Sequence, residues 1–321
     1  MSPFALVFPG QGSQSVGMGR SVADASPAAA AVFAEADAAL GAPISRLAWD
    51  GPAEDLDRTE NAQPALLAAS IAYLAAVRER WSAAGIDPVP VYAAGHSMGQ
   101  YSALVAAGAL SLTDAVQLVR ERGRQMQASG SGREGRMAAI IGLDDAALPM
   151  LIERASVHGA FGVANRNAPG QVVVSGERPA IEAATEIARE LGAKRAIVLP
   201  VSVAAHSPLM ADAAAAMRDT LAGIRFADPS PPLLANADGH PLATADACRA
   251  ELVEHLTTGV DWVRAVERMA GEGVTTFLEV GPGKVLTGLN RRIAPDAEVL
   301  ATDDPAAPDG LSVPFLSTVI A

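Results

Sequence analysis

The 321-residue chain carries a formal net charge of -12, with 36 acidic side chains against 24 lysines and arginines. Nucleic acid and anionic membrane surfaces both require a basic footprint, so this balance argues against either partner. Half of the residues are hydrophobic and 19% are charged, which allows a large core and excludes a disordered or fibrous protein. The single cysteine, Cys248, excludes an intramolecular disulfide and a cysteine-rich metal site, and no cofactor is expected.

The first predicted element is a buried strand at residues 4–8, Phe-Ala-Leu-Val-Phe. This apolar run stops at Pro9 and has no basic segment before it, so it is too short for a signal peptide or a membrane span. We therefore expect a cytoplasmic protein.

A glycine-rich loop follows at residues 10–19 and fits neither of two nucleotide-binding motifs. A dinucleotide fingerprint beginning at Gly10 would need glycine or alanine where Ser15 stands, and a P-loop would need lysine where Met18 stands. The remaining interpretation is a loop whose backbone N–H groups face an active site, with Gln11 supplying one oxyanion donor.

The pentapeptide Gly95-His96-Ser97-Met98-Gly99 predicts a nucleophile elbow. It lies between an apolar segment at 89–94, expected to be a buried strand, and a predicted helix at 100–107. Flanking glycines lack the Cβ atoms that would clash in such a tight turn. The Oγ of Ser97 would then lie at the positive end of a helix, where an oxyanion can be stabilised.

Further elements predict two structural units. Helices are expected at 61–79, starting near Pro64, and at 112–127, before the glycine- and serine-rich linker at 129–135. The next elements alternate as strand, helix, strand, helix and strand at 137–141, 144–156, 171–175, 178–191 and 196–199. We interpret this run as a small α+β subdomain at 131–199, inserted into a larger α/β domain formed by 1–130 and 200–321. The larger domain includes a strand at 275–280, and the tail from about residue 302 is expected to be peripheral.

A serine nucleophile needs a base, and His206 is the best candidate among five histidines. It lies where a strand opens into a loop before a helix, whereas His96 adjoins the nucleophile and His255 lies on an amphipathic helix. No acidic residue lies between Glu190 and His206, and over a hundred residues follow. This order favours a Ser–His dyad, oriented by a backbone carbonyl or amide, over the triad of a lipase or esterase.

Five motifs recur together in the order and spacing of one known family. They are residues 8–14 (FPGQGSQ), 95–99 (GHSMG), 165–171 (NRNAPGQ), 200–210 (PVS with HSPLM) and 279–284 (EVGPGK). Over about residues 4–293, the chain resembles the malonyl-CoA:acyl-carrier-protein transacylases of fatty acid and polyketide synthesis. The fold class implied is α/β, an α/β-hydrolase-like core with a parallel sheet plus an inserted small ferredoxin-like α+β subdomain.

The resemblance implies a ping-pong acyl transfer. Ser97 would take malonyl from malonyl-CoA or a related acyl-CoA, and the phosphopantetheine thiol of an acyl carrier protein would accept it. His206 resembles the general base, and the backbone amides of Gln11 and Met98 correspond to the oxyanion hole. Arg122 matches the arginine that pairs with the malonyl carboxylate, which suits a bidentate guanidinium.

The same resemblance implies further substrate-binding residues: Gln63, Asn165, Asn167, Ala205 and His255. The small side chains of Ala204 and Ala205 precede His206, where selectivity for the α-substituent is commonly set, so they would leave room for a methyl or ethyl branch. Relatives often carry glutamine at the position of His255. In those relatives the main-chain carbonyl of the glutamine orients the catalytic histidine. They also often carry glutamate where Gln100 stands.

Two other functions compete with a malonyl transferase of fatty acid synthesis. One is a freestanding polyketide acyltransferase that uses a branched malonyl unit or moves acyl groups between carriers. The other is a serine thioesterase or hydrolase, against which Arg122 and the absence of a late histidine argue. For carrier docking we expect two basic clusters, composed of Arg189, Lys194 and Arg195, and of Lys284, Arg291 and Arg292.

Overall fold

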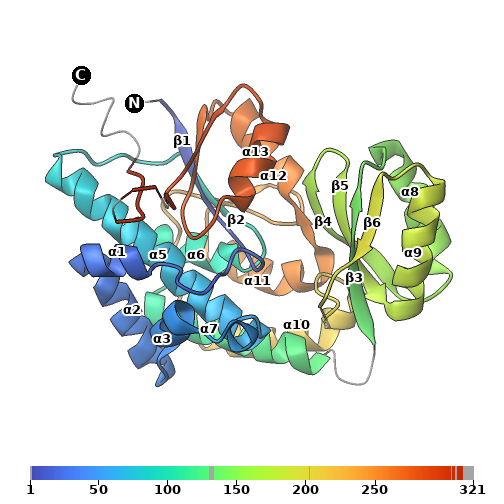
Figure 1. Cartoon of the computed structure of the whole chain (residues 1–321), viewed down its shortest axis with the longest axis horizontal. Helices are drawn as coiled ribbons and strands as arrows, with labels where there is room; N and C mark the ends of the chain where they lie inside the picture. Colours follow the sequence, from blue (N-terminus) through green and yellow to red (C-terminus); the bar gives the residue numbers. More distant parts are fainter. Residues whose placement is uncertain (1, 130–133, 202, 305, 308, 314–321) are drawn as a thin grey trace.

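The computed structural model describes residues 2–129, 134–201, 203–304, 306–307 and 309–313 (Figure 1). Its larger sheet contains, in spatial order, β11 (Glu298–Ala301), β10 (Thr276–Glu279), β1 (Phe4–Phe8), β2 (Tyr92–Gly95), β7 (Leu233–Leu234) and β8 (Pro241–Leu242). Its smaller sheet contains β6 (Arg195–Val198), β3 (Gly135–Ile141), β5 (Gln171–Glu177), β4 (Phe161–Ala168) and β9 (Val260–Asp261). The chain is therefore an α/β protein with one largely parallel and one largely antiparallel sheet.

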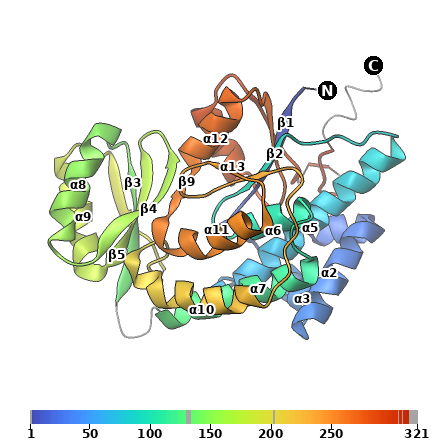
Figure 2. The same cartoon turned by 180° about the vertical axis from the view of Figure 1, so that it is seen from behind.

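Helices pack against the larger sheet and along one face of the smaller sheet (Figures 1 and 2). The N-terminal helices are α1 (Arg20–Ala25), α2 (Pro27–Leu40), α3 (Ile44–Asp50), α4 (Ala53–Leu56), α5 (Thr59–Ala83), α6 (Gly99–Ala106) and α7 (Leu112–Ser129). The later helices are α8 (Leu148–Ser156), α9 (Arg178–Glu190), α10 (Ala211–Ala222), α11 (Ala245–Thr258), α12 (Trp262–Gly271) and α13 (Val285–Ile293). Short 3₁₀ turns lie at η1 (Asp145–Ala147) and η2 (Pro208–Met210). Within the described part of the chain, no helix is both long and apolar enough to cross a membrane.

The central strand β1 is buried on both faces, which explains its unbroken apolar sequence. Phe4, Leu6 and Phe8 pack into the core shared with α5 and α7. Ala5 and Val7 pack on the other side, into the core shared with α12 and α13. Because β1 lies parallel to both β2 and β10, the carboxyl ends of these strands meet at one edge of the sheet, where ligands bind in open α/β sheets.

The smaller sheet corrects one prediction. Its chain order is β3-α8-β4-β5-α9-β6, so a fourth strand, β4, stands where the sequence showed no strand. The β4 segment carries Asn165, Arg166 and Asn167 in place of an alternating apolar pattern, and its pairing with β5 contains register shifts. At its other edge β4 pairs with β9 from the C-terminal part of the chain, which joins the two parts of the molecule. Figure 1 shows this sheet with α8 and α9 at one end of the molecule.

Three further predictions differ from the structure or lie outside it. Helix α5 begins at Thr59, so Pro64 lies inside the helix and not near its start. Most of the predicted linker, residues 130–133, lies outside the described residues. The tail after 302 is not peripheral where it is described, because Leu311 is buried in the main core and Asp303 accepts a 2.8 Å hydrogen bond from Tyr73 Oη.

Candidate active site

The turn from β2 into α6 holds Ser97 in a left-handed conformation, with φ 52°. Such backbone strain in a non-glycine residue costs on the order of 1–3 kcal/mol and is concentrated at functional sites. The two glycines that flank the turn have no room for a side chain: a Cβ on Gly95 would lie 2.0 Å from the Gly99 carbonyl carbon, and one on Gly99 would lie 2.2 Å from the Phe8 oxygen. The tight turn therefore requires both glycines.

Ser97 and His206 lie in hydrogen-bond contact, although 109 residues separate them in the sequence. The distance from Ser97 Oγ to His206 Nε2 is 2.8 Å. On the other side of the ring, His206 Nδ1 lies 2.6 Å from the backbone oxygen of His255. A carbonyl oxygen only accepts, so Nδ1 carries the proton, and Nε2 of the neutral ring is free to accept the serine proton. The geometry is that of a dyad oriented by a backbone carbonyl.

Arg122 of α7 is the buried cation of the site, with only 1% of its surface exposed. Its Nη1 donates to Gln63 Oε1 at 2.8 Å, and its Nη2 lies 3.1 Å from Ser97 Oγ and 3.4 Å from His255 Nε2. No carboxylate among the described residues forms an ion pair with it. A buried charge without a counter-ion is costly, so this site is electrostatically prepared for an anionic ligand.

The pKa of His206 is lowered to about 3, first by burial and then by the positive charge of Arg122. The hydrogen bond to His255 opposes this shift without reversing it. Burial likewise lowers the pKa of Arg122 itself. His206 is therefore neutral at physiological pH, the state that a general base requires.

If an acyl group is loaded on Ser97 with His206 as the base, this pKa predicts an unusual pH dependence of that step. In single-turnover experiments, the second-order rate constant for acylation of Ser97 should stay constant from about pH 8 to about pH 5, because the free protein keeps His206 neutral. A bound carboxylate would cancel the charge of Arg122 and raise the pKa of His206, so the maximal loading rate should decline at a higher pH than the second-order constant. A second-order constant that falls by half near pH 6.5 would contradict this assignment.

A cavity of about 700 Å³ opens beside the dyad, between the larger sheet and the smaller one. Of the predicted site residues it is lined by Gln11, Ser97, Arg122, Asn165, Asn167, Ala205 and His206. Three others do not line it. Gln63 and His255 are buried behind Arg122, and Met98, whose side chain is buried, is the N-cap residue of α6. The backbone N–H of a helix N-cap residue makes no hydrogen bond within the helix. The N–H of Met98 is therefore available to donate to another group.

The elbow also contacts the smaller sheet through the side chain of His96. His96 Nε2 lies 2.9 Å from Asn167 Oδ1 and 3.3 Å from Asn165 Nδ2, both on β4. Its ring packs against Trp262 at a centroid distance of 5.7 Å. The side chain of His96 thus makes contacts away from the dyad.

Two buried residues of this region gave no signal in the sequence. Asn236 follows β7 and accepts a hydrogen bond from Ser97 N, and Glu251 of α11 accepts one from Asn236 N. An asparagine after a short strand and a glutamate on a helix are ordinary features, so only their contacts distinguish them.

Comparison with known proteins identifies the family of the chain. A family model described as an acyl transferase domain matches residues 5–299. The chain belongs to the acyl transferase family. The malonyl CoA-acyl carrier protein transacylase of Escherichia coli K12 is 46% identical over 307 residues, which cover 96% of this chain and 98% of that protein.

Solved structures of acyl transferases agree with the fold. An acyl carrier protein S-malonyltransferase from Vibrio cholerae has a TM-score of 0.90 and 42% identity, covering 96% of this chain and 99% of that one. A malonyl-transacylase in complex with its type II PKS acyl-carrier protein has a TM-score of 0.87 and 42% identity, covering 94% and 95%.

Proposed function

We propose that this acyl transferase moves a malonyl group from coenzyme A to the phosphopantetheine thiol of an acyl carrier protein, through an acyl-Ser97 intermediate. The relatives described above carry the names of malonyl transferases that act with such carriers. The observation that carries the proposal is the buried, unpaired guanidinium of Arg122 beside Ser97 Oγ. A carboxylated acyl group supplies the missing negative charge, whereas acetyl does not.

The first half-reaction follows from the dyad. Ser97 Oγ attacks the thioester carbonyl carbon while His206 Nε2 takes the hydroxyl proton. The backbone N–H groups of Gln11 and Met98 would stabilise the oxyanion. When the carbon–sulfur bond breaks, the protonated His206 returns its proton to the departing thiolate of coenzyme A. The carrier thiol reverses these steps: His206 accepts its proton, its sulfur attacks the acyl-serine ester, and Ser97 regains its hydroxyl proton.

The residues behind the cavity wall support the cation. Gln63 holds Nη1 of Arg122, so its role is to orient the guanidinium and not to contact substrate. Ala205 lines the cavity close to the dyad. Its small side chain leaves room for a branch on the α-carbon of the malonyl group. We therefore propose a substituted malonyl unit of polyketide synthesis as a second substrate class. We place the reaction in the cytoplasm.

Of the six basic residues considered for carrier docking, two are engaged within the chain. Arg292 donates to the Pro169 oxygen at 2.7 Å, and Arg189 donates to the Ala196 oxygen at 3.1 Å. Lys284 precedes Val285, which lines the cavity, and both side chains are exposed. Because one arginine of each cluster is engaged, the position beside the cavity decides between the two clusters. We therefore favour Lys284 and Arg291 as the docking surface for an acidic carrier.

Replacing Arg122 tests the proposal. In Arg122→Ala, single-turnover loading of malonyl should fall by a factor of about 30 to 5,000, since breaking a buried charge pair costs about 2–5 kcal/mol. Loading of acetyl from acetyl-CoA should not show this loss, because acetyl has no carboxylate for Arg122 to bind and removal of the charge also raises the pKa of His206. Intact-mass measurement of the protein after each acyl-CoA gives both rates.

Arg124→Ala is the matched control on the same helix. Arg124 is 57% exposed and pairs with Glu60 at 3.6 Å, so its loss should leave the malonyl to acetyl ratio unchanged. Equal losses of malonyl and acetyl loading in Arg122→Ala would mean that Arg122 supports the fold and does not select the substrate.

A further inference from the structure

The nucleophile elbow lies beyond the point where β2 stops pairing with β7, although β2 remains paired with β1 as far as Gly95. β2 pairs with β7 at a single register position, Ala93 with Leu233. Beyond it, Gly95 N donates to Gln100 Oε1 at 3.1 Å, and Gln100 Nε2 donates to the Leu234 oxygen at 2.8 Å. A side-chain carboxamide thus replaces the missing backbone partner on this side of the turn.

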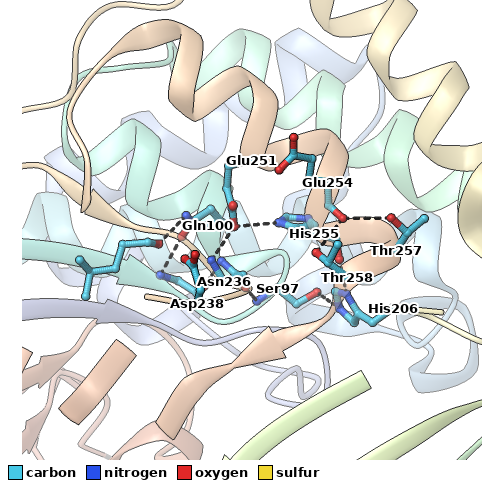
Figure 3. A network of polar contacts seen from close by, with 12 residues as sticks. Ser97, Gln100, His206, Asn236, Asp238, Glu251, Glu254, His255, Thr257 and Thr258 are labelled. Atoms are coloured by element: carbon cyan, nitrogen blue, oxygen red, sulfur yellow. Dashed lines mark hydrogen bonds and ion pairs between the residues drawn. The ribbon is translucent and has the colours of Figure 1, made fainter. Parts of the chain in front are cut away.

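Asn236 supplies a second carboxamide, directly at the nucleophile (Figure 3). Its Nδ2 donates to the Gly95 oxygen at 3.1 Å, and its Oδ1 accepts from Ser97 N at 2.8 Å. A backbone N–H only donates and a carbonyl only accepts, so these partners decide which amide atom is the oxygen. In a parallel sheet, each residue bonds to two residues of the adjacent strand, which lie before and after its direct neighbour. Its N–H donates to the carbonyl of the residue before that neighbour, and its carbonyl accepts from the N–H of the residue after it. The Asn236 side chain makes the same pair of bonds around His96.

The backbone of Asn236 is held as firmly as its side chain. Its N–H donates to Glu251 Oε1 at 2.5 Å, and its oxygen accepts from Asp261 N at 2.6 Å. Asn236 is 3% exposed and Glu251 is 5% exposed, so water does not compete for these bonds. Figure 3 shows Asn236 between Glu251 on α11 and Ser97 on the elbow.

We propose that Asn236 is a positioning residue for the nucleophile, and that Glu251 holds Asn236 in place. Its two bonds fix the peptide planes on either side of His96, from which the chain enters the left-handed conformation of Ser97. Without them, Ser97 Oγ leaves the position from which it both contacts His206 and faces the cavity. The inference rests on the proposed serine chemistry, but it concerns the geometry of the serine and not the acyl group that it receives.

The test measures the reactivity of Ser97 with a reagent that does not need Arg122. Phenylmethylsulfonyl fluoride is attacked at sulfur by Oγ, fluoride leaves, and His206 takes the serine proton. In Asn236→Ala, the labelling rate should fall about 10²-fold, the usual effect of misplacing a catalytic group by about 1 Å. In single-turnover loading, the maximal rate should fall by a similar factor while the half-saturating malonyl-CoA concentration stays unchanged.

Ser26→Ala is the control for a general loss of stability. Ser26 is also buried, and as the N-cap residue of α2 its Oγ accepts from Ala29 N at 3.1 Å, apart from the elbow and the cavity wall. This variant should lower the thermal midpoint while leaving the labelling rate unchanged. If Asn236→Ala is labelled at the wild-type rate, or is slowed no more than Ser26→Ala, the inference is wrong.

Substitutions of Glu251 decide the question if Asn236→Ala does not fold. Glutamine keeps an oxygen that can accept from Asn236 N, whereas leucine has none. Glu251→Leu should slow labelling, and Glu251→Gln should restore most of the lost rate. Equal rates in the two variants would overturn the proposal. Wild-type protein that reacts with the sulfonyl fluoride but not with malonyl-CoA would refute the proposed function alone, because the comparison at Asn236 does not use malonyl.

Discussion

Ser97→Ala should abolish the malonyl adduct that forms on the protein after exposure to malonyl-CoA, and transfer to a carrier should fall by a factor on the order of 10⁶. The described turn places no other hydroxyl in contact with His206 Nε2. Without Oγ, the imidazole has no proton to remove and no nucleophile attacks the thioester. Intact-mass spectrometry, followed by peptide mapping, measures the adduct and its position.

Ser13→Ala controls for the loss of a hydroxyl from the same cavity. Ser13 lines the cavity, but its only role in the proposal is to form part of the wall. This variant should be acylated at the wild-type rate, and the adduct should map to Ser97. A malonyl adduct that persists in Ser97→Ala would refute the assignment of the nucleophile.

His206→Ala should slow both half-reactions by a factor of about 10²–10⁴, the usual contribution of a positioned general base. The imidazole accepts the proton of Ser97 in loading and the proton of the carrier thiol in transfer. Loss of this base therefore slows both steps. Its removal also leaves a space that opens into the cavity, because His206 is one of the lining residues. Free imidazole added to this variant should therefore recover part of the loading rate.

His158→Ala serves as the comparison, since His158 is exposed and lies at the end of α8, on the smaller sheet. Its loading rate should match that of the wild type, with or without added imidazole. If His206→Ala loads malonyl at the wild-type rate, another group removes the proton from Ser97. The assignment of His206 as the general base would then be wrong.

Arg122 connects the proposed selectivity to the chemistry. Its Nη2 lies 3.1 Å from the attacking oxygen, so a carboxylate bound to the guanidinium brings the adjoining thioester close to Ser97. The same charge lowers the pKa of His206. Binding of a carboxylate would thus orient the acyl group and strengthen the base in a single event.

Much of the local structure was predictable because it depends on neighbours in the sequence. The apolar run of β1 and the paired glycines around Ser97 each specify a local conformation, so β1 and α6 were expected within one residue of their bounds. Strand β2 begins at Tyr92, three residues later than expected. Strand β4 was missed because its side chains are polar and its pairing is irregular, so it lacks the alternation that indicates a strand. The division into two domains at 131–199 stays a prediction, and the pairing of β9 with β4 shows how closely the two sheets are joined.

Residue types and short motifs were sufficient to predict the α/β class, the acyl transferase family and the residues that could act as nucleophile, base and carboxylate-binding cation. Those conclusions depend on side-chain chemistry and on short motifs, which are readable in one dimension. Two of the contacts that hold these groups in place became apparent only from the folded chain: Gln63 on Arg122 and Asn236 on Ser97. The third, the His255 carbonyl on His206, was expected from the family resemblance alone, because every residue carries a backbone carbonyl and the residue type does not mark it. A buried amide becomes distinctive only when folding brings its partner, from many residues away, to within hydrogen-bond distance.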